Sequence, residues 1–144
     1  MLRLASVVIV SSLWLLTSSC GRKEDPAPEL EGRWDATRAS VDHYDFYNHS
    51  TTHNDYSYQP GEQYLVFNGL QCEEHQSIQG VPPMTVFAYS RQGDTLVFTN
   101  PTISASLQKR AILEHTKTTL RLRYKIVLGT SGHSFLNEVT YTRP

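Results

Sequence analysis

From residue 30 onward, apolar and polar residues alternate with a period of two, in short runs broken by turn residues at spacings of about ten residues. The clearest run places Leu120, Leu122, Tyr124 and Ile126 on one face and basic residues on the other. Because successive residues of a strand point to opposite faces, such a run predicts a strand with one buried and one exposed face. Several such runs in series predict an all-β domain whose antiparallel sheet folds on itself.

The breaks between the runs predict where the sheet reverses direction. The pairs Phe87/Tyr89 and Leu96/Phe98 flank Gln92-Gly93-Asp94 and form the clearest hairpin in the chain. Further turns are expected at Asn68-Gly69, at Thr116 to Thr118 and in the glycine-rich segment 129–134.

Two segments lack a sustained period. Residues 42–60 are polar and aromatic, and we expect a long loop there between early strands, with room for a short strand inside it. Residues 103–115 fit either a strand, a turn and a strand or else a short helix, and we favour the strands.

The N-terminus has the pattern of a targeting segment. Arg3 precedes residues 4–16, which form an unbroken uncharged run rich in Leu, Val and Ile. As a helix rising about 1.5 Å per residue, this run would cover roughly 20 Å of a hydrocarbon core about 30 Å thick. The run is too short to span a membrane, so we expect a cleaved signal peptide over residues 1–19.

The end of this leader contains a cysteine motif. In the sequence LTSSCG at residues 16–21, two serines precede Cys20 and a glycine follows it. The motif resembles the lipobox of bacterial lipoproteins, with Thr17 where the family usually has Leu. The resemblance implies lipid on the Cys20 thiol and a protein anchored in the cell envelope at the outer membrane, on its periplasmic or surface face. The alternative is a secreted protein that is cut near Ser19 and keeps Cys20 free.

The remainder divides into a tether and one domain. Residues 20–29 carry mixed charge and two prolines but no large apolar residue, which predicts a flexible tether. Residues 30–144 suffice for one domain with its own core. Lipid on Cys20 would leave Cys72 without a partner, and we expect Cys72 to be buried.

The charge balance argues against nucleic acid as a partner. The chain has 13 basic and 14 acidic residues and a formal net charge of −1. Nucleic-acid binding depends on a positive face that neutralises phosphates, and this composition does not supply one.

The order of features across residues 30–142 resembles the bacterial lipocalin-like lipoprotein domains. The resemblance is carried by L-x-G-x-W at Leu30 to Trp34, the Leu65 and Phe67 strand ending at Gly69, the hairpin through Tyr89, Gly93, Asp94 and Leu96, the L-x-L arm at Leu120 and Leu122, and Tyr141. It implies an up-and-down antiparallel barrel of about eight strands, with interior room for side chains or one small ligand. It supplies no catalytic residues.

Eight apolar and aromatic residues are expected to point into this barrel. They are the candidate ligand-binding or core residues Trp34, Phe67, Phe87, Tyr89, Leu96, Phe98, Leu122 and Tyr124. They fit either an apolar ligand cup or a dry core, and the length of the domain favours a filled core with at most a shallow pocket at its mouth.

No pattern for catalysis or for a cofactor stands out. His43, His49 and His53 lie among acidic residues, but their spacing fits no defined metal motif, and we expect a solvated surface rather than a metal site. The segment 129–134, GTSGHS, is not a G-x-S-x-G nucleophile elbow, and a hairpin loop is the better interpretation.

Two functional hypotheses remain. The first is a non-enzymatic, membrane-anchored binding protein for a small apolar or amphipathic molecule. The alternative is a protein–protein interaction, inhibitor or accessory module that uses the segment 42–59, whose Tyr, Asn, Ser and His side chains suit adaptable contacts. The sequence does not identify a protein partner.

Overall fold

The computed structural model of the chain describes residues 29–77, 83–99 and 108–144. The expected signal peptide and Cys20 lie outside the described residues, as does all of the expected tether except Glu29. Within the described ranges the chain forms strands and no helix. A helix long and apolar enough to cross a lipid bilayer is therefore absent from these ranges.

Nine strands are described, and all of their pairings are antiparallel. They are β1 (Gly32–Tyr44), β2 (Ser50–Ser57), β3 (Gln63–Asn68), β4 (Gln71–Gln76), β5 (Met84–Gln92), β6 (Thr95–Thr99), β7 (Lys109–His115), β8 (Thr119–Val127) and β9 (Ser134–Thr142).

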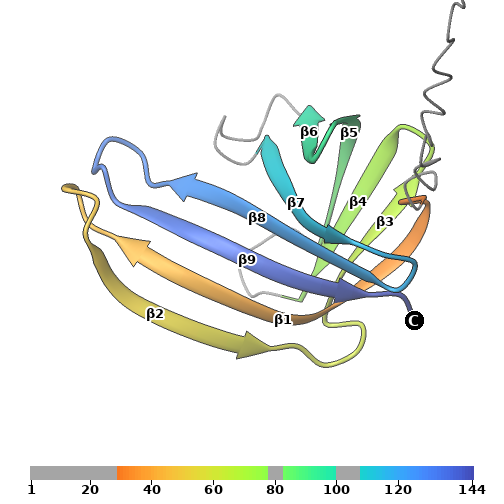
Figure 1. Ribbon diagram of the computed structural model, residues 1–144, viewed down its shortest axis with the longest axis horizontal. Helices are drawn as coiled ribbons and strands as arrows, with labels where there is room; N and C mark the ends of the chain where they lie inside the picture. Colours follow the sequence, from red (N-terminus) through yellow and green to blue (C-terminus); the bar gives the residue numbers. More distant parts are fainter. Residues whose placement is uncertain (1–28, 78–82, 100–107) are drawn as a thin grey trace, which may run out of the picture.

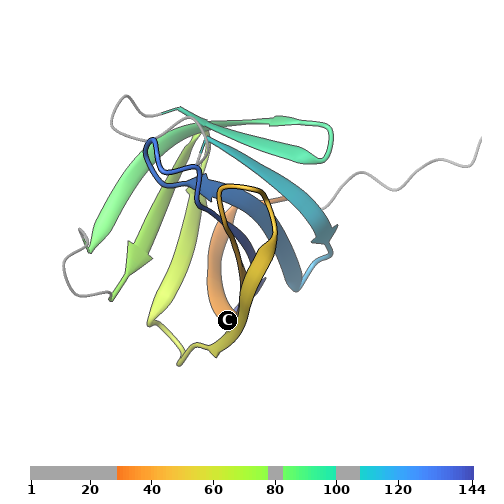
Figure 2. The same ribbon diagram turned by 90° about the vertical axis from the view of Figure 1, so that its left-hand side faces the viewer.

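Eight of these strands close into a barrel. From β3 to β9 each strand pairs with the next, β9 pairs with β1, and β1 pairs with β3. Among the described strands β2 pairs with β1 only, so it flanks the barrel as an added edge strand (Figure 2). This topology confirms the predicted all-β, up-and-down antiparallel barrel, and it is consistent with a lipocalin-like fold.

The two ends of the barrel differ in their connections. At one end, which we call the Trp34 end, two-residue turns join β3 to β4 at Gly69-Leu70 and β5 to β6 at Gly93-Asp94. Both glycines have φ of 58°, a left-handed conformation that costs glycine little. The first turn lies one residue later than predicted, and the second lies where the sequence placed it. The opposite end, the far end, has longer connections, including the predicted glycine-rich loop between β8 and β9.

Four strands reach well beyond the barrel at the far end, as Figure 1 shows. We call this part the extension and define it as residues 38–57 of β1 and β2 together with residues 124–137 of β8 and β9. The strand alternation that points Ala39 and Val139 into the core continues along the extension. One side is therefore an inner face, continuous with the barrel interior, and the other is an outer face.

The short strand allowed for within residues 42–60 is present as β2, but the long loop expected around it was wrong. β1 continues to Tyr44, and residues 50–57 form β2, which pairs with β1 along its whole length. All eight residues of β2, STTHNDYS, are exposed, and neither face of the strand carries a row of apolar residues. The sequence therefore lacks the alternation of apolar and polar residues that would have predicted this strand. Of the ambiguous segment 103–115, residues 109–115 form β7 and the predicted strand is confirmed there, while residues 103–107 lie outside the described residues.

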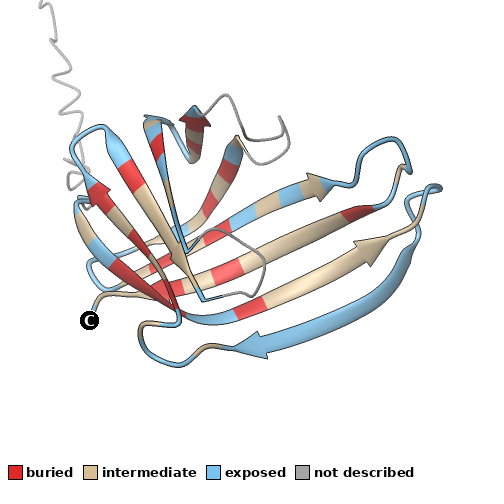
Figure 3. Ribbon diagram, turned by 180° about the vertical axis from the view of Figure 1, so that it is seen from behind, coloured by how far each residue is buried: buried red, intermediate tan, exposed pale blue. Residues whose placement is uncertain are grey.

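The core fills the Trp34 end and the middle of the barrel. Figure 3 shows that buried residues gather on the barrel strands and become sparse along the extension. Trp34 is fully buried, its indole Nε1 donates a 2.7 Å hydrogen bond to the Leu30 carbonyl, and the Arg143 guanidinium lies 4.5 Å from its ring centre. The core residues all lie between Leu30 and Tyr141, so the segment 29–144 contains the whole described core.

Candidate functional site

The eight residues predicted to point inward all belong to or contact the core. Trp34, Phe67, Phe87, Leu96, Phe98 and Leu122 are buried, and Tyr89 and Tyr124 are partly buried and pack against them. Near the Trp34 end these side chains contact one another, since the rings of Phe67 and Tyr89 lie 4.9 Å apart and edge-on. Tyr124 lies elsewhere, where the barrel meets the extension, and its neighbours are polar.

Those neighbours include a buried ion pair that sequence reasoning missed. Arg110 on β7 donates to both oxygens of the Glu74 carboxylate on β4, with Nη2–Oε2 of 2.7 Å and Nη1–Oε1 of 3.3 Å. The side chains are only 5% and 12% exposed. The sheet register explains their position, because Arg110 pairs with buried Leu96 and Glu74 with buried Leu65, which places both charged side chains inside the barrel.

Two aromatic rings contact the Arg110 guanidinium. Its Cζ atom lies 4.6 Å from the ring centre of Phe98 and 4.8 Å from that of Tyr124. Burial lowers the pKa of Arg110, but attraction to Glu74 more than offsets this and raises the pKa above its ordinary value. The guanidinium is therefore charged at every accessible pH, and its charge is balanced by the carboxylate.

Three buried polar atoms in this part of the interior have no hydrogen-bond partner within the part of the chain that the structure describes. They are Arg110 Nε, Asn137 Nδ2 and Tyr141 Oη, and three further buried atoms outside this cluster, His115 Nε2, Arg121 Nε and Arg143 Nε, also have no hydrogen-bond partner among the described residues. Asn137 pairs across the β8–β9 ladder with Tyr124, whose ring contacts Arg110, and Tyr141 interacts electrostatically with both Tyr124 and Arg110. Buried polar groups in folded proteins are almost always satisfied, so three unsatisfied atoms in one region mark a place where a partner is missing. We call Arg110, Glu74, Tyr124, Asn137 and Tyr141 the interior polar cluster.

Burial keeps the ionisable neighbours of this cluster neutral. It raises the pKa of Tyr124 to about 12, and it raises the pKa of Tyr141 well above its ordinary value. Cys72 on β4 is buried as predicted, and burial raises the pKa of its thiol to about 12. Neutral phenols and a neutral thiol therefore surround one balanced ion pair.

Beyond the cluster, the inner face of the extension carries apolar side chains that are only partly buried. They include Val41 on β1, Ile126 on β8 and Phe135 on β9. The ring of His43 packs edge-on against Phe135 with 4.3 Å between centres. This arrangement sets a partly buried apolar surface beside buried hydrogen-bond donors, which is the combination that an amphipathic molecule requires.

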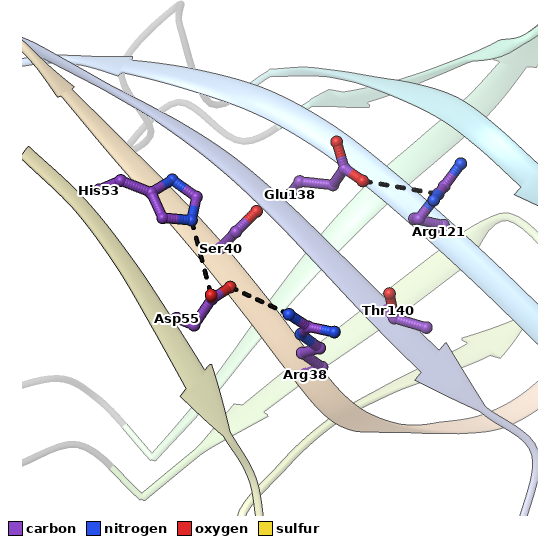
Figure 4. A pocket seen from close by; sticks show the side chains of 7 residues that line it. All are labelled: Arg38, Ser40, His53, Asp55, Arg121, Glu138 and Thr140. Atoms are coloured by element: carbon purple, nitrogen blue, oxygen red, sulfur yellow. Dashed lines mark hydrogen bonds and ion pairs between the residues drawn. The ribbon is translucent and has the colours of Figure 1, made fainter. Parts of the chain in front are cut away.

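A cleft of about 300 Å³ lies on the outer face of the extension. Figure 4 shows the residues that line it: Arg38, Ser40, His53, Asp55, Arg121, Glu138 and Thr140. Its ion pairs are long, since Arg38 Nη2 lies 3.4 Å from Asp55 Oδ1 and Arg121 Nε lies 3.6 Å from Glu138 Oε1. Opposite charges alternate across this solvated surface, so the cleft offers no net field to concentrate one kind of ion.

The three histidines considered as metal ligands do not come together. His43 lies on the inner face, whereas His53 on β2 lies on the outer face and its Nδ1 is 2.6 Å from Asp42 Oδ1. His49 lies in the β1–β2 loop, with Nδ1 3.4 Å from Asp45 Oδ2. Within the residues that the structure describes, no three potential metal ligands converge.

The remaining candidate regions hold local structural contacts. In the predicted loop 129–134, the Ser131 hydroxyl donates a 2.7 Å hydrogen bond to the Leu128 carbonyl and closes the turn. At the Trp34 end, an open depression of about 470 Å³ is lined by Glu29, Leu30, Glu31, Tyr89 and Arg91. Nothing in either place aligns a nucleophile with a base.

Comparison with known proteins gives no assignment. No protein-family model matches the chain, and no curated protein has significant sequence similarity to it.

Proposed function

We propose that this chain is a non-enzymatic, lipid-anchored protein of the cell envelope whose barrel binds one small amphipathic molecule at the far end. The observation that carries the proposal is the set of three unsatisfied buried atoms in the interior polar cluster, next to the partly buried apolar inner face of the extension. The polar end of a bound amphipathic molecule would form hydrogen bonds with the unsatisfied atoms, and its apolar body would cover the inner face of the extension.

The position of the first described residue supports the orientation of such a protein. The Glu29 carbonyl accepts a 2.6 Å hydrogen bond from Arg143 Nη2, which holds the start of the domain at the Trp34 end. A tether arising there would join the domain at the end of the barrel opposite the proposed ligand entrance, so it would leave that entrance uncovered.

Native mass spectrometry of protein purified from its own envelope tests the binding role. The proposal predicts a discrete additional mass that stays with the folded domain and is released on unfolding. A uniformly empty domain would overturn it.

The anchor is tested separately by membrane fractionation. Cys20→Ala should move the protein from the membrane to the soluble fraction, because without acyl chains nothing else in the proposal holds it there. Cys72→Ala is the matched control, since Cys72 is buried in the barrel and its loss should leave the distribution unchanged. Membrane retention of the Cys20→Ala protein would contradict the lipid anchor.

A second candidate function is a protein-interaction module built on the β1–β2 hairpin. Two observations favour it: β2 has one edge without a paired strand among the described residues, and Phe46 and Tyr47 at the hairpin loop are 66% and 75% exposed. An exposed strand edge is a template for an added strand from a partner. In this case a Phe46→Ser/Tyr47→Ser variant should lose an envelope protein that cross-links reproducibly to the wild type while the barrel stays folded. An unchanged cross-link would remove this candidate.

A further inference from the structure

We infer that the polar end of the bound molecule is an uncharged hydrogen-bond acceptor, such as an amide or ester carbonyl, received by the unsatisfied donors of the interior polar cluster. This inference rests on the proposed function and names the chemical class of its ligand. Three features of the cluster lead to it: the kind of groups left unsatisfied, the charge balance around them, and the apolar surface beside them.

The unsatisfied groups are donors. Arg110 Nε carries one N–H and the Asn137 amide nitrogen carries two, and neither atom accepts a hydrogen bond. The Tyr141 hydroxyl can donate as well as accept. A molecule that satisfies any of these donors must therefore present an acceptor atom, and an ammonium or other donor-only group would leave them unsatisfied.

The charge balance excludes a carboxylate as the preferred acceptor. The positive charge of Arg110 is already neutralised by Glu74 through two hydrogen bonds. The other ionisable groups around the pair among the described residues, Cys72, Tyr58, Tyr124 and Tyr141, are neutral at neutral pH, and burial raises the pKa of each further above its ordinary value. A carboxylate placed here would add a buried negative charge without its own counterion, which is costly in a low-dielectric interior.

The geometry also explains why Nε is the free position. Both terminal nitrogens of Arg110 donate to Glu74, and the ring centres of Phe98 and Tyr124 lie 4.6 Å and 4.8 Å from its Cζ atom. The Nε edge is therefore the part of the group left for a third partner. Its orientation is fixed by the ion pair, so the acceptor meets a donor that needs no reorganisation.

Calorimetric titration of the segment 29–144 with three probes of equal chain length tests the inference. The probes are decanamide, which is a neutral acceptor, decanoate, which is an anionic acceptor of nearly the same shape, and decylammonium, which has no acceptor. At neutral pH we expect decanamide to bind at least about tenfold more tightly than either ion, because only it satisfies the donors without adding charge. Decanoate binding as tightly as decanamide would overturn the inference and leave the proposed function standing. Failure of all three probes to bind would overturn the proposed function itself.

A hydroxyl-deletion variant locates the binding at the cluster. Tyr141→Phe removes one unsatisfied donor and no hydrogen bond of the unliganded protein, so the fold should persist while decanamide affinity falls about three- to tenfold. Tyr47→Phe removes an exposed hydroxyl in the β1–β2 loop and should leave the affinity unchanged. Equal decanamide affinity in wild type and Tyr141→Phe would place the ligand elsewhere and contradict the role given to Tyr141.

Discussion

Replacing Glu74 by glutamine tests the buried ion pair on which the candidate site depends. The substitution keeps the shape of the side chain and removes one charge, so it leaves the Arg110 guanidinium charged in a position where its side chain is only 5% exposed. Breaking one partner of a buried pair in this way costs about 3–5 kcal/mol, because the remaining charge is neither solvated nor paired. Domains of this size unfold with about 5–15 kcal/mol, so the loss should be a large part of the total stability.

The assay is equilibrium urea unfolding of the segment 29–144, with Glu138→Gln as the matched control. Glu138 is likewise held by arginines, with Arg123 Nη2 at 2.8 Å and Arg121 Nε at 3.6 Å, but these arginine side chains are 47% and 41% exposed. The control should therefore cost only about 0–1 kcal/mol. Replacing both Arg110 and Glu74 by leucine should recover most of the stability that Glu74→Gln loses. If Glu74→Gln cost no more than Glu138→Gln, the pair would have to be solvated, and the reasoning about a charge-balanced interior would be refuted.

Three other outcomes follow from single groups. Tyr141→Phe should raise the free energy of unfolding of the unliganded domain by about 1 kcal/mol in urea titrations, because it removes a buried unsatisfied hydroxyl, and a loss of stability would contradict this. His53 should titrate above 6.5 in NMR spectra, because the hydrogen bond to Asp42 raises its pKa. The stabilisation from this contact is fully present below the pKa of the unfolded state and is lost as pH rises through the pKa of the folded state. Asp42→Asn should lower the pKa of His53, and an unchanged titration would count against the contact. Cys72, whose pKa burial raises to about 12, should react with a disulfide reagent at pH 8 only after unfolding in urea, and rapid reaction of the native protein would show that the thiol is exposed.

The barrel was predictable because its strands have one buried and one exposed face. The period of two in β8 follows directly from burial of Leu120 and Leu122, and the glycine turn between β5 and β6 fixes the direction of the neighbouring hairpin. β2 gave no such signal, since a strand exposed on both faces has no reason to alternate. β2 is held by backbone hydrogen bonds to β1, and the side chains of β2 give no sign of this pairing.

The candidate site was only partly predictable for a related reason. Tyr124 was identified as an inward residue, but Arg110 and Glu74 were not identified. A signal existed for Glu74, because it follows Cys72 by two positions and therefore lies on the same face as a residue expected to be buried. The partner of that carboxylate is 36 residues away on β7, and only the closed topology brings the two together.

A crystal structure of the segment 29–144 with decanamide would test the central claim most directly. The account predicts the carbonyl oxygen of the probe at about 2.7–3.2 Å from Arg110 Nε, with the alkyl chain along the inner face of the extension. An empty interior at saturating probe, or a probe seated only in the outer-face cleft beside Arg38, would contradict it.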